Sequence, residues 1–332
     1  MPRFGTAGVV LLAVGVLAMP GCGREKTTDS ERVRVALVSN SPAGFSPIAR
    51  RGAEQAAAEF DVDVEFHPLQ NGTAAEQRTL VEGLVAKGIK AIAISPNDAA
   101  NQADFLDEVA DKIPLITHDS DLPSGSKRAC YVGVDNYEVG RTAGQLVKEA
   151  MPEGGSVVVL TGQDDAHVAL ERRRGLRDEL VGQHDKGLKS SQYVLADARA
   201  DDIQQKECQT LVKDALAKYG SQPKRLCLVS LWACKTPAVL SAVKDAHLEG
   251  KVRLVGFDED EETLQGVKDG VIYGAIVQQP FEFGYETVKI MARLAHGDHS
   301  ILPETGVRIL DHKVITGDNV DGFRAELNKR KQ

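Results

Sequence analysis

Short apolar runs alternate with longer segments of helical period along most of the chain. In the first half, the pattern predicts strands over Val33–Val38, Val62–Phe66, Ala91–Ile94, Ile113–Thr117 and Cys130–Val134, and helices over Pro47–Phe60, Ala74–Lys87 and Ala99–Asp111. Gly88 directly follows one of these helices, as a left-handed cap residue does. Alternating strands and helices indicate βαβ units, a parallel sheet and right-handed crossovers.

The same order repeats after Asn136. The second half predicts helices over Tyr137–Ala150, Ala166–Val181, Asp202–Tyr219, Pro237–His247, Glu261–Lys268 and Pro280–Ala295, and strands over Ser156–Leu160, Gln192–Leu195, Leu226–Val229, Val252–Phe257 and Tyr273–Val277. We therefore predict an α/β protein of two Rossmann-like lobes with parallel sheets. A cleft between the facing sheet ends is the default ligand site.

The stretch from residue 113 to residue 136 carries the first candidate binding group. Asp119 lies just past the carboxyl end of a predicted strand. In an open parallel sheet, the side chains at this end of the strands line the ligand crevice. The next strand ends in Asp135 and Asn136, where a helix begins. We expect a binding carboxylate at the sheet edge, followed by the first crossing to the other lobe.

Further candidates share this position at or just past the ends of strands. They are Ser39, Asn40 and Phe45 after the first strand, then Ser95, Asp119, Trp232, Asp258 and Gln278, with Arg172 in the first turns of a helix that follows a strand. Carboxylates accept hydrogen bonds from vicinal hydroxyls, and a guanidinium donates to ring or hydroxyl oxygens. Aromatic rings pack on the apolar C–H faces of a sugar. Because paired carboxylates repel an anion, the set predicts a neutral sugar.

Several candidates have a purely structural alternative. Asp119 and Asp258 are residues of the type that caps turns and helices. Arg172 belongs to a run of three arginines, and a basic run on a helix is usually a solvated face. Trp232, the single tryptophan, equally suits the core. The position of both carboxylates at strand ends favours binding.

The N-terminus indicates an export signal followed by a tether. Arg3 precedes thirteen apolar or small residues, Ala7–Met19, which are too few to span a bilayer as a helix. Residues 1–21 resemble a bacterial lipoprotein signal peptide, with Cys22 as the lipidated first residue of the mature chain. Ordinary cleaved secretion is the alternative. Residues 22–32 are polar and without apolar period, which is typical of a flexible tether.

Charge and cysteine spacing narrow the possible partners. The net charge of -8 over 332 residues argues against a nucleic-acid partner, which requires a basic face. The cysteines after the signal form no C-x-x-C pair and therefore predict no zinc or thioredoxin-like site: Cys130, Cys208, Cys227 and Cys234. A Cys208–Cys227 disulfide and buried free thiols both remain open.

The sequence carries no motif of an enzyme. It lacks G-x-S-x-G, G-x-x-x-x-G-K-[ST], H-E-x-x-H and a dinucleotide fingerprint after the first strand. His296 and His299 form an H-x-x-H, but no third metal ligand is nearby in the sequence. We therefore predict a protein that is not an enzyme and has no cofactor or metal.

A set of motifs, in order and spacing, resembles a known family. The motifs are Ser39 to Phe45 with Ala49–Gly52, Ala91–Pro96, Ile116–Asp119, Val134–Asn136 with Gly140, Glu171–Leu176, Val255–Asp258 and Ile276–Pro280. Over these residues the chain resembles the periplasmic sugar-binding proteins of ABC importers, which have the type I fold of the ribose-binding protein.

The resemblance implies a role for most of the candidate residues. It places Asp119, Arg172, Asp258 and Gln278 at positions that hydrogen-bond sugar in the family, Ser39 at a polar contact and Phe45 at a stacking ring. Four positions depart from the ribose-binding pattern: Ser95 and Trp232 replace asparagines, Ser120 replaces an arginine and Ala198 replaces a phenylalanine. Because these positions shape the pocket, the resemblance implies a sugar but not ribose in particular.

The family's organisation supplies the remaining expectations. The N-terminal lobe is expected to comprise residues 33–134 and 279–309, and the C-terminal lobe residues 135–278 and 310–332, joined by three hinge strands. We expect a monomeric receptor, anchored to the membrane through its lipid in the periplasm, that delivers sugar to the transmembrane subunits of an ABC permease. A ligand sensor of the same fold that docks on a chemoreceptor or histidine kinase is the alternative.

Overall fold

The structure is a computed structural model that describes residues 1, 32–40, 45–69, 72–161, 167–182, 192–200, 205–232 and 235–331; at residues 197–200, 205–208 and 331 it describes the backbone alone. The chain divides into two compact units, Met1–Glu31 and Arg32–Gln332. The fold and the site described below belong to the second unit.

The first half of this unit builds one six-stranded sheet. Its elements are β1 (Val33–Ser39), α1 (Phe45–Glu59), β2 (Val62–Pro68), α2 (Ala74–Ala86), β3 (Ile92–Ile94), α3 (Ala99–Ala110), β4 (Leu115–His118) and β5 (Cys130–Gly133). The strand order is β11-β5-β4-β3-β1-β2, where β11 is Val307–Ile309. The strands pair in parallel throughout, which confirms the predicted α/β class.

The second half builds a sheet of the same order. Its elements are α4 (Asn136–Ala150), β6 (Gly155–Thr161), α5 (His167–Leu180), β7 (Tyr193–Ala200), α6 (Gln205–Tyr219), β8 (Leu226–Ser230), α7 (Thr236–Asp245), β9 (Arg253–Phe257), α8 (Glu261–Lys268), β10 (Gly274–Val277), α9 (Pro280–Ala295), β12 (Lys313–Thr316) and α10 (Val320–Lys331), with the short 3-10 turns Pro223–Arg225 and His299–Ile301. The order is β12-β10-β9-β8-β6-β7.

The described chain passes between the two sheets three times. It leaves the first sheet after β5, returns to it after β10 through α9, and leaves again between β11 and β12. The strand after the last crossing is the exception in an otherwise parallel arrangement, because β12 runs antiparallel to β10.

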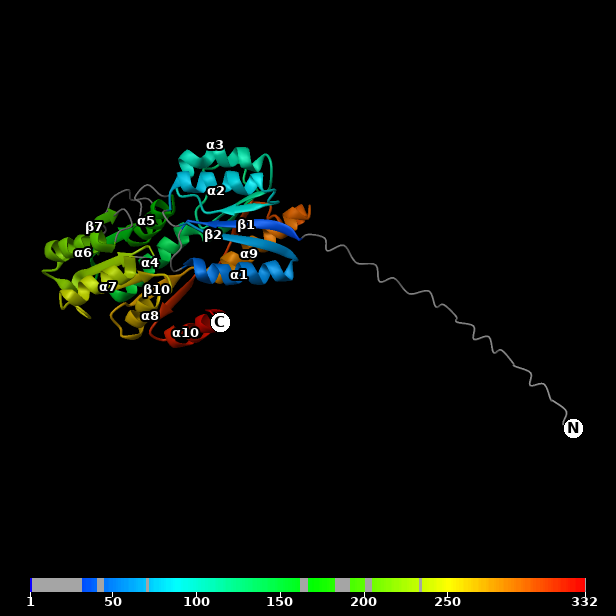
Figure 1. The fold of residues 1–332 in the computed structure, drawn as a ribbon. Coiled ribbons are helices and arrows are strands. Elements are labelled where there is room, and N and C mark those ends of the chain that lie inside the picture. Colours follow the sequence, from blue (N-terminus) through cyan, green and yellow to red (C-terminus); the bar gives the residue numbers. More distant parts are fainter. Residues whose placement is uncertain are drawn as a thin grey trace. The chain divides into compact units, whose positions relative to one another are not determined.

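Alternate residues of the strands face two different helix layers. In β1, Val35 and Leu37 pack with α1 and α9, whereas Ala36 and Val38 pack with α2 and α3. Figure 1 shows these two helix pairs on opposite sides of β1 and β2. The strands of the second half divide in the same way between α4 with α5 and α6 to α8. Burial on both faces explains why the strands are continuous apolar runs.

Side-chain caps fix where several helices begin. Thr73 accepts a hydrogen bond from the backbone N–H of Glu76 at 3.1 Å, and Asp135 accepts one from that of Glu138 at 3.1 Å. Each satisfies an N–H that the first turn of a helix leaves unpaired. The cap at Asp135 therefore starts α4 directly after the first crossing.

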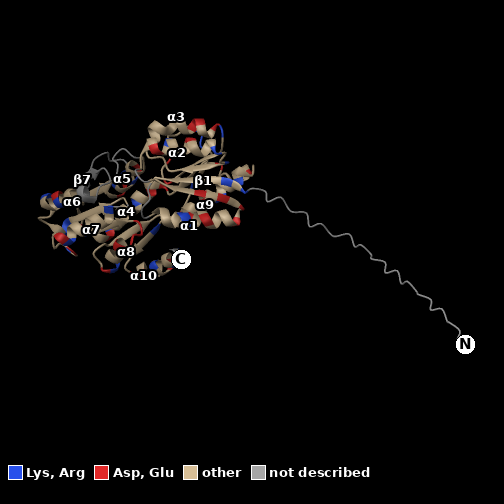
Figure 2. Ribbon diagram, in the orientation of Figure 1, with Lys and Arg blue, Asp and Glu red and all other residues tan. Residues whose placement is uncertain are grey.

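Acidic and basic residues are mixed along the outer helices (Figure 2). Within α2, Arg78 pairs with Glu82 at 3.0 Å, and in α1 Arg50 lies 4.0 Å from Glu54. Such exposed pairs one helical turn apart contribute about 0.3–0.5 kcal/mol each. They account for charged positions that have no part in the candidate site.

One helix pair in each half approaches closely through glycines. In the α1–α9 pair, a Cβ atom added to Gly284 would lie 1.8 Å from the carbonyl oxygen of Ala49, and one added to Gly52 would lie 1.9 Å from that of Phe281. In the α4–α5 pair, a Cβ atom added to Gly140 would lie 2.0 Å from the carbonyl oxygen of Arg172, and one added to Gly175 would lie 2.0 Å from that of Tyr137. Only glycine permits these distances. The α4–α5 contact therefore holds the backbone of Arg172 directly.

The α1–α9 contact gives a test of the fold. Replacing Gly284 by alanine forces the helices apart, so we expect Gly284→Ala to lower the free energy of unfolding by about 1–3 kcal/mol. Gly83→Ala is the matched control, because Gly83 is exposed within α2 and nothing lies within 4 Å of an added Cβ. The control should gain about 0.5–1 kcal/mol. Urea unfolding measures both, and a Gly284→Ala protein as stable as the wild type would contradict the packing.

Candidate functional site

Two carboxylates occupy equivalent turns at the ends of two strands. Asp119 follows β4 with φ +60°, and Asp258 follows β9 with φ +63°. The N–H of Asp119 donates to the carbonyl of Val132 in β5 at 3.1 Å, and that of Asp258 donates to Ile276 in β10 at 2.8 Å. Left-handed backbone in a residue other than glycine costs about 1–3 kcal/mol and is concentrated at functional sites. Neither aspartate is the N-cap of the helix that follows, because Asp135 and Asp260 have that role.

Arg172 lies on α5 with only 3% of its surface exposed. Its guanidinium donates from Nε to Oδ1 of Asn136 at 2.9 Å, from one terminal nitrogen to the carbonyl of Leu231 at 2.9 Å, and from the other to Oε1 of Gln278 at 3.1 Å. It also lies 4.2 Å above the ring of Phe257. The expectation of a solvated basic face is therefore wrong for Arg172.

Gln278 connects this guanidinium to the second carboxylate. Its Oε1 accepts from Arg172, and its Nε2 donates to Oδ1 of Asp258 at 3.3 Å. Burial lowers the pKa of Arg172, and the negative charges of Asp119 and Asp258 act in the opposite direction. Burial raises the pKa of Asp258 to about 7, against the charge of Arg172 and the hydrogen bond from Gln278. The groups thus share one electrostatic environment.

The first sheet contributes smaller polar groups. Nδ2 of Asn40 donates to Oδ2 of Asp119 at 3.4 Å, so the structure brings these two predicted residues together. Ser39 is buried, with its hydroxyl 2.6 Å from that of Ser46. Ser95 is fully buried, its hydroxyl has no hydrogen-bond partner among the described residues, and its carbonyl accepts from Gln77 at 2.6 Å.

The predicted aromatic residues and Ser120 have different settings. Phe45 is the first residue of α1, not part of a loop, and packs edge-on against Phe283 with ring centroids 5.1 Å apart. Trp232 is only partly buried, with its ring centroid 5.9 Å from the Arg172 guanidinium, so it is not a core residue. Ser120 is partly buried, and its backbone N–H donates to the carbonyl of His118 at 2.7 Å.

Three residues of the site were not predicted. They are Asn136, Tyr131 and His118. Tyr131 donates its hydroxyl to the carbonyl of Asp119 at 3.0 Å, and a ring nitrogen of His118 lies 3.1 Å from the carbonyl of Val38. Burial lowers the pKa of His118, and the charge of Asp119 acts in the opposite direction. The sequence indicated Asn136 only as the start of a helix, because its hydrogen-bond partner, Arg172, lies 36 residues away in the chain.

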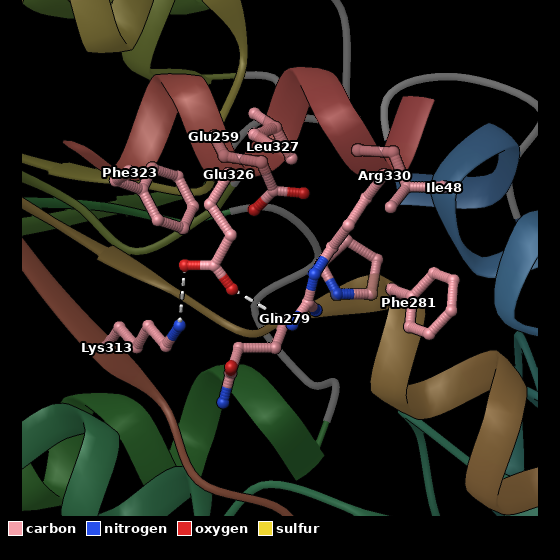
Figure 3. A pocket seen from close by; sticks show the side chains of 10 residues that line it. Ile48, Glu259, Gln279, Phe281, Lys313, Phe323, Glu326, Leu327 and Arg330 are labelled. Carbon is pink, nitrogen blue, oxygen red and sulfur yellow. Dashed lines mark hydrogen bonds and ion pairs between the residues drawn. The ribbon is translucent and has the colours of Figure 1, made fainter. Parts of the chain in front are cut away.

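A groove beside the crossings lies under α10 (Figure 3). Its walls are Ile48, Glu259, Gln279, Pro280, Phe281, Lys313, Phe323, Glu326, Leu327 and Arg330. Glu259 and Gln279 directly follow Asp258 and Gln278 in the chain, so neighbouring residues serve the candidate site and the groove. Arg330 pairs with Glu282 of α9 at 3.2 Å.

Some predictions fall outside the described residues. Cys22 and Cys234 are not described, and neither is the side chain of Cys208. Cys130 and Cys227 are buried free thiols. Among the described residues, no helix is long and apolar enough to cross a membrane and no cluster of three or more metal-binding side chains occurs.

Comparisons with known proteins converge on one family. The sequence pattern of the family described as "Periplasmic binding protein domain" matches residues 35–299. The chain is 25% identical to the Ribose import binding protein RbsB of Salmonella typhimurium, over 78% of this chain and 82% of that one. It is 23% identical to the Fructose import binding protein FruE of Bifidobacterium longum, over 85% of this chain and 86% of that one.

Solved structures agree with these relatives. An ABC transporter solute-binding protein from Burkholderia graminis, in complex with D-arabinose, superposes with a TM-score of 0.77 at 25% identity, covering 88% of this chain and 97% of that one. GanP, a glucose-galactose binding protein from Geobacillus stearothermophilus, superposes with a TM-score of 0.76 at 26% identity, covering 87% and 99%. Both likenesses extend over nearly the whole described chain.

The raised pKa of Asp258 predicts a pH dependence of stability. An aspartate has a pKa of about 3.9 in an unfolded chain. Between that value and about 7 the folded protein binds more protons at Asp258 than the unfolded protein does, so stability falls as pH rises through this window. We expect the wild type to lose more unfolding free energy between pH 4.5 and 8 than Asp258→Asn does.

Urea unfolding across that pH range measures this difference. Asp318→Asn is the control, because Asp318 lies in an exposed turn and its replacement should leave the wild-type profile in place. Identical pH profiles for the wild type and Asp258→Asn would show that Asp258 titrates as it does in the unfolded chain.

Proposed function

We propose that this chain, which belongs to the periplasmic binding protein family, holds a neutral monosaccharide between its two halves and delivers it to an ABC permease. Like its relatives, which are import binding proteins, the chain is a binding protein and not an enzyme. The observation that carries the proposal is the arrangement of Arg172 with Asp119 and Asp258, two carboxylates that project from equivalent turns of different sheets.

The chemistry of these groups suits a hydroxyl-rich ligand without charge. A guanidinium has five N–H donors, and the contacts of Arg172 described above use three of them. The other two are suited to sugar oxygens, while each carboxylate accepts from vicinal hydroxyls. Hydrogen bonds to charged groups contribute about 1.5–3 kcal/mol each. The partly exposed ring of Trp232 supplies an apolar face for the C–H side of a sugar ring.

The relatives support a class of ligand more than one sugar. Their names state ribose, fructose and allose, and the solved structures contain or name arabinose, glucose and galactose. These molecules differ in ring size and stereochemistry, but all are neutral polyols. The departures at Ser95, Ser120 and Trp232 change the size and the hydrogen-bond donors of the proposed pocket. We therefore propose the ligand class, a neutral monosaccharide, and not one particular sugar.

We propose further that the two halves are lobes that close on the ligand. The N-terminal lobe would comprise residues 33–134 and 279–309, and the C-terminal lobe residues 135–278 and 310–332. Two observations support these bounds: the division of the strands between the two sheets, and the packing of α9 against the first sheet. A ligand held by Asp119 on one side and by Arg172 and Asp258 on the other makes all its bonds only when the lobes close, so closure is the signal that the permease receives.

Export and anchoring complete the proposal. Residues 1–21 would be a signal peptide, residues 22–32 a tether, and Cys22 the lipid-bearing residue of a monomeric receptor on the periplasmic side of a membrane. The signal pattern in the sequence supports this placement, as do relatives that are named import binding proteins. Mass spectrometry of the protein purified from membranes tests it, because lipidation adds a diacylglycerol mass at Cys22 and ordinary secretion does not.

A thermal-shift panel tests the ligand class. The panel contains D-ribose, D-allose, D-arabinose, D-fructose, D-glucose and D-galactose, with amino acids and dicarboxylates as controls. A ligand that binds only the folded state raises the melting temperature by mass action. We expect at least one sugar to raise it by several degrees. A response to amino acids or anions alone would overturn the proposal.

Substitutions at the charged groups should separate binding from folding. We expect Asp119→Asn and Arg172→Lys each to weaken the affinity for the best sugar of the panel by roughly 10-fold to 150-fold, the equivalent of about 1.5–3 kcal/mol. Arg174→Ala is the control, because Arg174 lies two residues from Arg172 but is about half exposed and pairs with Glu171. Calorimetry measures the affinities, and unchanged values in both site variants would remove these residues from the site.

A further inference from the structure

Asn136 has a contact whose chemistry fixes the orientation of its amide. It is the first residue of α4, directly after the first crossing between the sheets. Its side chain accepts the Nε–H of Arg172 at 2.9 Å. A guanidinium has donors only, so the accepting atom is the amide oxygen and Nδ2 is left to donate elsewhere.

Tyr131 of β5 lies five residues before Asn136 in the chain. Burial raises the pKa of the Tyr131 phenol, which keeps its hydroxyl protonated and able to donate. The hydroxyl of Tyr131 in turn donates to the carbonyl of Asp119 at 3.0 Å. The same hydroxyl lies 3.5 Å from the carbonyl of Val134, so Tyr131 connects the turn of Asp119 to the residues that lead into Asn136.

Gly133 provides independent support for the position of this hydroxyl. A Cβ atom on Gly133 would lie 2.0 Å from Oη of Tyr131 and 2.2 Å from the carbon that carries it. Tyr131 and Gly133 are two residues apart in β5 and therefore face the same side of the strand. The glycine leaves the space into which the phenol folds back toward the crossing.

We propose that Asn136 is a positioning residue, which fixes the Arg172 guanidinium relative to the strand end that carries Asp119. Tyr131 ties the turn of Asp119 to the chain that leads into Asn136, and hydrogen bonds continue from Asn136 through Arg172 and Gln278 to Asp258. The value of this arrangement for sugar binding rests on the proposed function. The positioning itself is a property of the protein without ligand.

The location of the link explains how it serves a site that opens and closes. Tyr131 and Asn136 flank the first crossing and are only five positions apart in the chain, so both lie close to the pivot about which the halves would turn. Atoms near a pivot move least. The side chain of Asn136 is not needed as a helix cap, because Asp135 caps α4. Its amide is therefore available to hold Arg172 in both states.

The Nε–H resonance of Arg172 in ligand-free, nitrogen-15-labelled protein tests the proposal. The resonance is assigned by its loss in Arg172→Lys. We expect slow exchange with water in the wild type and exchange faster by at least roughly 10-fold in Asn136→Ala, since a lost hydrogen bond to a charged group corresponds to this factor or more. Asn136→Asp keeps the acceptor and should retain the slow resonance. Asp135→Ala removes the cap of the same helix and should leave it in place.

Binding of the best sugar of the panel supplies the second measurement. We expect Asn136→Ala to weaken affinity by roughly 10-fold, because Arg172 loses one of the hydrogen bonds that orient it. An Arg172 resonance that is unchanged in Asn136→Ala would overturn the proposal. If no sugar binds the wild type, the proposed function fails, while the resonance still decides the role of Asn136.

Discussion

A guanidinium buried between two sheets is the constraint on which the middle of this molecule depends. Removing a charge from water costs several kcal/mol unless other groups replace the lost solvation. For Arg172 the replacement comes from Asn136, the carbonyl of Leu231, Gln278 and the ring of Phe257. These groups lie at or just past the ends of four different strands, β5, β8, β9 and β10, so the charge can be accommodated only when those strand ends are correctly placed relative to each other.

The two halves have the same local arrangement at the end of their fourth strand. Each sheet has an equivalent strand order, and in each the fourth strand of the sequence ends in an aspartate with left-handed backbone whose N–H bonds to the next strand. This turn directs a carboxylate out of the sheet while its backbone stays tied to it. Reciprocal glycine contacts between one pair of helices in each half then fix the layer behind the strands.

Local sequence patterns predicted much of this fold. The apolar runs located β1 to β10 and α1 to α9, and strand ends located Asp119, Asp258 and Gln278. The start of α1 was predicted two residues late, at Pro47, although proline fits the first turn, where its missing N–H is not needed. The burial of Arg172 was beyond sequence reasoning, because the three arginines of its run differ only in helical phase relative to α4. The contacts of Tyr131 with Asp119 and of Asn136 with Arg172 depend on side-chain orientation, and no sequence spacing encodes them.

The groove under α10 has a practical consequence for handling the protein. Its wall includes Glu259 and Gln279, the immediate neighbours of Asp258 and Gln278, and Arg330 near the carboxyl end reaches across to Glu282. A dye, purification tag or fusion partner attached after α10 would disturb the groove and, through it, the backbone that carries Asp258 and Gln278. Placing such labels on the outward faces of α2 or α3 keeps the reporter separate from the chemistry it is meant to report.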